Sequence, residues 1–329
     1  MALLYKRRYE LLIGNGQDAL RVSSVANVGL SGDGKRITQD PGQQQAFRIA
    51  FLVQHDYGDN QQFAEITVYG LSDETEARIQ EQYTYVLLQA GYQEIYGPIF
   101  KGQIVNVERG RSGEGGVDKY IRFFCSTAQK EISTAYANLV FAENTDYTEI
   151  IRQCAATMGF SVIFVGDWSF AGKRAQSWVI NGSASKAFKR MANTLQFDWF
   201  LRDNQTMVCK KRGYVVEGET FHFSAATGMK GRPRLNLLGV DFTVSLNPLV
   251  QLGRVVEIDS MYPEFSFGDA YWLKVPRTAA QGQYEVARLT HAGDSHGQAW
   301  DTNLECWRYN AAERKAILDK VVDRQFRNG

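Results

Sequence analysis

The sequence predicts a mainly β fold with a small α+β insert, and three observations support this prediction. Apolar and polar residues alternate in many short stretches, as expected of half-buried strands. The chain has 30 glycines, 6 prolines and 12% aromatic residues, a composition that favours strands joined by tight turns. Between residues 131 and 215 the apolar spacing becomes helical. With 329 residues, the chain is long enough for two or three domains that each bury a core.

Residues 1–130 are predicted to form a β domain. Five stretches have the strand pattern: 46–56, 64–71, 84–92, 98–110 and 118–127. Ser72 is the expected N-cap of a helix that runs to about Tyr83, because acidic residues fill the turn that follows it. The last two strands flank a glycine-rich turn, which predicts a hairpin.

Residues 131–215 are predicted to form a small α+β domain. Asp146 is the expected N-cap of a helix that ends at Gly159, and Glu149 completes a capping-box pattern. A second helix over 183–197 has a continuous apolar stripe. A short hairpin closes the segment, and its apolar residues are interpreted as core.

Residues 216–309 return to the strand pattern, and 310–329 are predicted to form a C-terminal helix. Two strands lie around the Asn247–Pro248 turn, and a long hairpin turns at Gly293–Gly297. The terminal helix has a narrow apolar stripe, which makes it a candidate for docking on a neighbouring domain or chain; packing on its own domain is the alternative. The stripe consists of Ile317, Leu318, Val321, Val322 and Phe326.

A pair of similar hairpins suggests an internal repeat. Residues 102–125 and 282–306 both begin with Gly-Gln, turn through glycine and polar residues, and end in a strand that contains aromatic residues and a cysteine. We therefore predict that 1–130 and 216–309 fold as two similar β domains. A chance similarity between two hairpins is the alternative.

Charge and composition exclude several classes of protein. The net charge is +1, whereas domains held to nucleic acid by bulk charge are strongly basic. No apolar run is long enough to span a membrane, and the N-terminus lacks the pattern of a signal peptide, so we expect the protein to stay in the cytoplasm where it is made. The four cysteines lie far apart with no CxxC pair, which argues against structural zinc and predicts free, mostly buried thiols.

The segment GLSGDGKR at 29–36 has the spacing of a phosphate-binding P-loop as far as its lysine. Arg36 stands where Ser or Thr would hold magnesium, and Pro41 lies where a helix should begin. A polar loop is the better interpretation. Tight ATP binding that is lost in Lys35→Ala would contradict it.

Other candidate chemical groups are equally weak. His291 and His296 share a turn with Asp294, but their spacing on a hairpin does not direct both imidazoles to one point. The basic patches at 6–8 and 210–212 are short, and we interpret each as a solvated or subunit-contact face. We therefore predict no catalytic residue, no cofactor and no metal site.

Several segments resemble, in the same order, the baseplate hub proteins of tailed phages, Mu-like and other contractile-tailed phages among them. These segments are VYGLSDETEARI (68–79), VLLQAGYQEIYGPIFKGQIVNVERG (86–110), SASKAFKRMANTLQFDWFLRDNQTMVC (183–209), VSLNPLVQLGRVVEI (244–258) and LTHAGDSHGQAWDTNLEC (289–306). The resemblance covers most of residues 64–309. Gly70 stands where Asn is common in the family, and the first 63 residues match only loosely, so the subtype stays open.

The resemblance implies a non-enzymatic structural protein of the virion, placed in the tail baseplate and assembled in the host cytoplasm. It implies a homotrimer in which each chain has two tube-like β-barrel domains, so that three chains present a pseudo-sixfold ring. Such a ring joins the six-fold tail tube to the three-fold central spike and forms part of the DNA conduit. The implied partners are the tail tube, central spike, baseplate wedge and tape-measure proteins, with no sequence-specific binding of DNA and no stable membrane insertion.

Two alternatives stay open. In the first, the chain is the hub of a phage-derived contractile bacteriocin or secretion machine, which has the same fold and role but passes no DNA. Alternatively it is a tail-associated cell-wall hydrolase, for which the sequence offers no convincing acid–base pair.

Overall fold

The computed structural model describes residues 6–15, 18–24, 47–58, 62–112, 118–202, 205–236, 239–266 and 281–308. The fold is mainly β with a few helices, as the sequence predicts. The loop at 29–36 and the C-terminal segment 310–329 lie outside the described residues. None of the described helices is long and apolar enough to cross a membrane.

One 14-stranded sheet runs through both β regions. The first region contributes β1 (Arg7–Gly14), β2 (Ala19–Ser23), β3 (Ile49–Asp56), β4 (Phe63–Tyr69), β5 (Tyr85–Tyr92), β6 (Tyr96–Ser112) and β7 (Asp118–Ser126). The second contributes β15 (Phe221–Ser224), β16 (Met229–Leu235), β17 (Gly239–Ser245), β18 (Val255–Asp259), β19 (Glu264–Phe265), β20 (Gln281–Asp294) and β21 (Trp300–Arg308). Most neighbouring strands are antiparallel; β15 with β18 and β16 with β19 are parallel.

The two β regions have the same strand order. Across the first region the order is β3-β4-β7-β6-β5, and across the second it is β16-β17-β21-β20-β18. In each region, the first two strands along the chain form a hairpin, and the third strand lies farthest from it in the sheet. The last two strands form a second hairpin, which lies between the first hairpin and the third strand. The same five-strand unit thus occurs twice along the chain.

The hairpins β6–β7 and β20–β21 also have a bulge at the same place. One extra residue, Val105 or Ala287, lies beside a buried cysteine, Cys125 or Cys306, on the partner strand. Counted from the bulge, the Gly-Gln dipeptide of the first hairpin is two residues closer than that of the second. When the two hairpins are aligned at the bulge, their cysteines therefore occupy the same position, whereas their Gly-Gln dipeptides do not.

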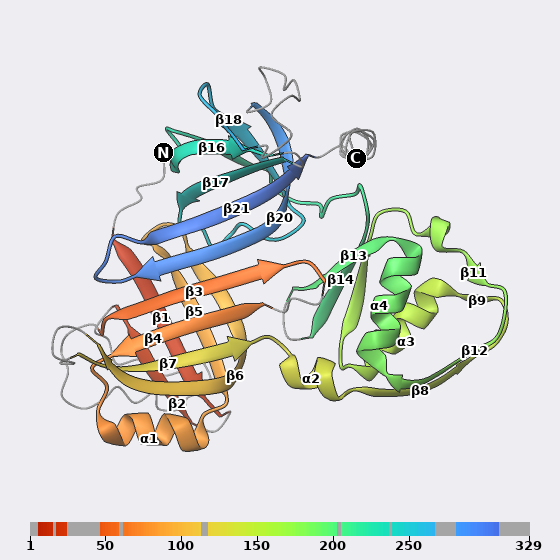
Figure 1. Cartoon of the computed structure of the whole chain (residues 1–329), viewed down its shortest axis with the longest axis horizontal. Helices are drawn as coiled ribbons and strands as arrows, with labels where there is room; N and C mark the ends of the chain where they lie inside the picture. The colour runs from red at the N-terminus through yellow and green to blue at the C-terminus, as the bar shows by residue number, and fades with distance from the viewer. Residues whose placement is uncertain are drawn as a thin grey trace, which may run out of the picture.

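Strand β3 pairs with β20 and joins the two β regions into one layer. Figure 1 shows β17, β21, β20, β3, β4 and β7 following one another in this layer, with β1 and β5 behind it. The sequence did not predict this connection, since nothing in either strand specifies a partner so far along the chain. The helix α1 (Asp73–Gln82) lies beside the first β region, on the side away from β20. The Ser72 hydroxyl accepts a hydrogen bond from the Thr75 N–H, which confirms the predicted N-cap.

The insert between the regions has its own core. Its elements are α2 (Gln129–Thr134), β8 (Tyr136–Phe141), β9 (Thr145–Asp146), α3 (Tyr147–Thr157), β10 (Ser161–Val165), β11 (Lys173–Arg174), β12 (Trp178–Ser183), α4 (Ala184–Leu195), β13 (Phe197–Leu201) and β14 (Thr206–Lys211). The predicted apolar stripe of α4 packs against α3 and the β10-β14-β13 sheet, with Phe188 and Met191 buried in that core. The predicted hairpin is β13–β14.

The capping box predicted for α3 is wrong. Asp146 lies at the N-cap position, but its side chain makes no capping hydrogen bond. Glu149 does not reach back to it and instead accepts a hydrogen bond from the Gln153 side chain. Asp146 also belongs to the short strand β9, and pairing of β9 with β11 sets the backbone conformation just before the helix.

Candidate functional site: the junction of the three cores and the open sheet face

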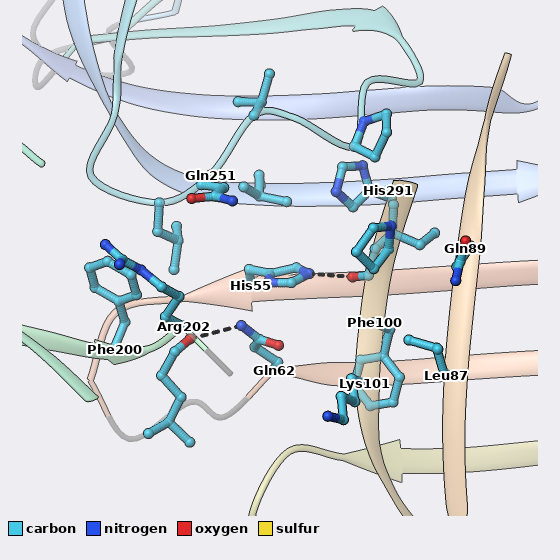
Figure 2. Close-up of a pocket in the computed structure, with 17 residues that line it drawn as sticks. His55, Gln62, Leu87, Gln89, Phe100, Lys101, Phe200, Arg202, Gln251 and His291 are labelled. Carbon is cyan, nitrogen blue, oxygen red and sulfur yellow. Dashed lines mark hydrogen bonds between the residues drawn. The ribbon is translucent and has the colours of Figure 1, made fainter. Parts of the chain in front are cut away.

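A pocket of about 400 Å³ lies where the two β regions and the insert meet. Figure 2 shows its wall, to which His55 comes from β3, His291 from β20 and Arg202 from the end of β13. Glutamine and apolar side chains complete the wall. Among the described residues, its ionisable lining groups are Lys101, Arg202 and the two histidines, and none of them is a carboxylate.

His55 and His291 lie across the β3–β20 connection, and their rings meet edge to face with centroids 5.8 Å apart. The His55 Nε2 is 2.9 Å from the Ile99 carbonyl oxygen, and the His291 Nδ1 is 2.9 Å from the Thr302 hydroxyl. Burial lowers the pKa of His55 to about 4. Burial, and then the charge of His55, hold the pKa of His291 well below its ordinary value. Both rings are therefore neutral near pH 7, and their contact lies between β3 and β20, where the two β regions are joined.

A buried ion pair fastens the insert to the second β region. The Lys210 Nζ on β14 lies 2.8 Å from the Glu285 Oε1 on β20, and neither side chain has any exposed surface. The Tyr57 hydroxyl donates to the same carboxylate at 2.7 Å, and Lys210 also donates to the Tyr214 carbonyl at 2.9 Å. The interpretation of 210–212 as a solvated or subunit-contact face is therefore wrong for Lys210. The Glu285 carboxylate on β20 compensates for the buried charge.

The HAGDSHG turn does not bring its two histidines together. His291 is buried, whereas His296 is exposed with its Nδ1 3.0 Å from the Ser295 hydroxyl. Asp294 receives the Arg48 guanidinium at 2.8 Å, which holds the pKa of this carboxyl below its ordinary value. Within the part of the chain that the structure describes, no group of three His, Cys, Asp or Glu is placed to hold a metal.

The residues around this turn instead connect the N-terminal strand to the β20–β21 hairpin. The Trp300 side chain is fully buried, donates its indole N–H to the Gly91 carbonyl at 3.0 Å, and meets the Phe51 ring edge to face. A Cβ at Gly293 would lie 2.3 Å from the Phe51 ring, so only glycine fits there. Arg7 donates to the Asp294 and Gln298 carbonyls at 3.1 and 2.9 Å. The Arg7 contacts give the basic patch at 6–8 a structural role that the sequence did not reveal.

The joined sheet presents one face to solvent across both β regions, and we call it the open face. On β3, exposed Leu52 and half-buried Gln54 alternate with Phe51 and Val53 of the core. The row that contains Gln54 crosses five strands without a charge, from β17 to β4, and reaches Lys230 on β16. Its members, in register, are Thr243, Asn303, Thr290, Gln54 and Phe63.

Two clusters of ion pairs lie beside the row, and in each of them carboxylates outnumber guanidinium groups. Arg288 donates through Nε to Asp56 at 2.9 Å and also faces Glu305 at 3.4 Å. The Arg122 guanidinium lies 3.2 Å from Glu65 and 3.7 Å from a second carboxylate, that of Glu108. The face is therefore broad, polar and acidic at these clusters.

The remaining predicted residues fall into two groups. The four cysteines are free and buried, as predicted, and burial raises the pKa of Cys125 and Cys154 to about 12. Lys35 and the stripe of the C-terminal segment lie outside the described residues, and the stripe remains a prediction: Ile317, Leu318, Val321, Val322, Phe326.

Comparison with known proteins identifies a family. A family model described as "Baseplate hub gp41" matches residues 47–269. No curated protein matches the chain in sequence.

Solved structures share the fold at low sequence identity. The 43 kDa tail protein of prophage MuSo2 from Shewanella oneidensis is 10% identical, with a TM-score of 0.56 over 92% of this chain and 99% of that chain. A tail protein from Neisseria meningitidis MC58 is 10% identical, with a TM-score of 0.54 over 92% of this chain and 97% of that chain.

A third solved structure comes from a secretion system. The E. coli c3393 protein is described as a component of the type VI secretion system with structural similarity to the T4 bacteriophage tail proteins gp27 and gp5. It is 9% identical, with a TM-score of 0.50 over 82% of this chain and 76% of that chain.

Proposed function

This chain belongs to the baseplate hub gp41 family, and on that premise we propose that it is the central, non-enzymatic hub of a phage tail baseplate. Three copies form a closed ring, assembled in the host cytoplasm and carried in the virion. The ring joins the six-fold tail tube to a three-fold central spike. Its partners are the tube, spike, wedge and tape-measure proteins, and DNA passes through its centre.

The repeated strand order carries this proposal. Each chain has two five-strand units with the same order, joined edge to edge through β3 and β20. Three such chains supply six similar units around one axis, which matches a six-fold tube on one side while the assembly keeps three-fold symmetry. A chain with one unit would need six copies to do the same.

The open face supports a role in the conduit. In the two clusters beside its uncharged row, each guanidinium group faces two carboxylates. Such clusters repel phosphates. We therefore propose that this face lines the channel.

The hub of a contractile secretion machine is the second candidate. The fold is shared with a type VI secretion component. The two candidates differ in whether DNA passes, so the presence of capsid and terminase genes beside this one distinguishes them.

The oligomeric state of the purified chain tests the proposal. Light scattering after gel filtration is expected to give a mass three times that of the 37.1 kDa chain, alone or with the spike protein. An electron-microscopy map should then show six similar units around the channel. A chain that stays monomeric when mixed with its tube and spike proteins would contradict the hub.

A further inference from the structure

The insert contains a two-stranded ribbon in which β8 pairs with β12 in antiparallel register. Figure 1 shows this ribbon along the lower right margin of the molecule, beneath α3 and α4. One side of the ribbon packs on the insert core through Ala137, Phe141 and Ile180. On the other side, Tyr136 and Val140 are 65% and 73% exposed.

The main-chain groups of the exposed residues point away from the ribbon. The Ala184 N–H donates to the Ala135 carbonyl at 3.1 Å, which fixes the alternation of the ladder. Ala137, Leu139 and Phe141 therefore use their N–H and C=O groups toward β12. The same groups of Tyr136, Asn138 and Val140 point outward, and within the described residues no other strand pairs with this edge of β8.

Nothing in the ribbon protects this edge. Proteins usually guard an open strand edge with charges, proline or a covering element. The twelve residues of β8 (YANLVF) and β12 (WVINGS) include no charged residue and no proline, although 22% of the whole chain is charged. Two strands are also fewer than a sheet normally needs for stability of its own. An unprotected edge in an otherwise charged surface indicates that a partner covers it.

We propose that the outer edge of β8 binds an extended, uncharged segment of another baseplate protein, which adds to the ribbon as a third strand. Main-chain hydrogen bonds from Tyr136, Asn138 and Val140 hold the added strand, and their exposed side chains select small or apolar residues at alternate positions. The edge of β12 is less suitable, because Ser183 at its end caps α4 and only Val179 and Asn181 of this strand are exposed.

A different protein fits this edge better than a second copy. Pairing of β8 with its own counterpart needs a two-fold axis, which a closed ring of three chains lacks. We therefore assign the edge to a segment from outside the ring, and an uncharged segment suits it because β8 and β12 offer no charge to pair with a charged one. This inference rests on the proposed function because the baseplate supplies the partner.

Two substitutions at one position separate main-chain pairing from side-chain contact. Asn138→Pro removes an outward N–H while leaving every β8–β12 hydrogen bond in place. Asn138→Val keeps that N–H and changes only the exposed side chain. We expect tail particles made with Asn138→Val to contain as much of this chain as wild-type particles do. We expect Asn138→Pro to lower the amount by about tenfold or more, since it blocks the central hydrogen bond of the added strand. Thermal melts of both purified variants establish that each one folds.

Hydrogen exchange on the wild-type chain gives a second measurement that needs no variant. Exchange in the peptide that covers β8 should slow by about tenfold or more between the purified chain and the assembled particle, while the peptide that covers β12 stays unchanged. Equal incorporation of the two variants, or β8 exchange that does not change on assembly, would overturn the proposal. Protection of β8 already present in the purified chain would mean that a second copy is the occupant. Absence of the wild-type chain from tail particles would instead contradict the hub.

Discussion

Lys210 has no exposed surface, and its charge is compensated across the junction by a carboxylate from β20. The sequence places it in a run of three basic residues on a strand, and such runs are usually solvated. What buries Lys210 is contact with Glu285 and Tyr57, which are distant in the chain. Periodicity within one strand carries no information about such partners, so this junction could not be predicted.

Removal of one charge of this pair should be costly. Glu285→Ala removes the nearer carboxylate and leaves the buried Lys210 ammonium with only that of Asp198, 3.8 Å away. We expect the free energy of unfolding to fall by about 3 kcal/mol. The matched control is the exposed pair of Arg152 and Glu149, where Arg152→Ala should cost less than about 1 kcal/mol. Urea denaturation of both variants measures the difference. Equal losses would show that Glu285 does not compensate for Lys210.

The buried histidines should make the protein sensitive to acid. The pKa of His55 is about 4 in the folded chain and 6.5 in the unfolded chain, so the unfolded chain binds more protons between these values. The free energy of unfolding should therefore fall as the pH is lowered from 6.5 toward 4. His55→Gln keeps a donor for the Ile99 carbonyl and should reduce this slope, with the remainder due to His291. Denaturation at pH 7, 6 and 5 tests this, and an unchanged slope in the variant would contradict it.

At the scale of the elements, long alternating strands and long helices were predictable and short ribbons were not. The hairpins β6–β7 and β20–β21 were predicted because their two strands are adjacent in sequence and a glycine-rich turn joins them. Strands β8 and β12 were missed because α3 and three short strands separate them and neither has a long alternating pattern. Strands β1 and β2 were also missed, although Tyr9, Leu11 and Ile13 of β1 alternate toward the core.

The helix caps provide a prediction at this scale. The Ser183 hydroxyl is placed to accept from the Lys186 N–H at the start of α4, whereas Asp146 makes no such bond at the start of α3. Ser183→Ala should therefore lower the free energy of unfolding by about 1 kcal/mol. Asp146→Ala should cost less than half of that, since only its interaction with the helix dipole is lost. Thermal melts followed by circular dichroism compare the two, and a larger loss for Asp146→Ala would contradict this assignment.

For the whole molecule, the mainly β fold and the family resemblance could be predicted, because they depend on patterns that lie within single segments. The arrangement of those segments could not. The pairing of β3 with β20 puts residues from the two ends of the described chain side by side. The same pairing creates the open face and one wall of the pocket, so neither could be placed from the sequence.

The C-terminal segment offers a test of assembly. Its apolar stripe of Ile317, Leu318, Val321, Val322 and Phe326 is predicted to dock on a neighbouring domain or chain. Deletion of residues 311–329 should therefore weaken the proposed trimer more than it lowers the melting temperature. Sedimentation velocity and a thermal melt on the full chain and the truncated chain measure both quantities. A truncated chain that melts earlier but assembles equally well would place the stripe within its own chain.

The connection between β3 and β20 also determines how the molecule can move. Seven consecutive residue pairs cross it, from Arg288 opposite Asp56 to Asp294 opposite Ala50. A hinge needs a few residues that rotate freely, and a strand pair of this length has none. The two β regions of one chain therefore turn together as a rigid body. In the proposed ring of three chains, any widening of the channel would therefore take place at the boundaries between chains, and the part of the wall that each chain supplies would keep its shape.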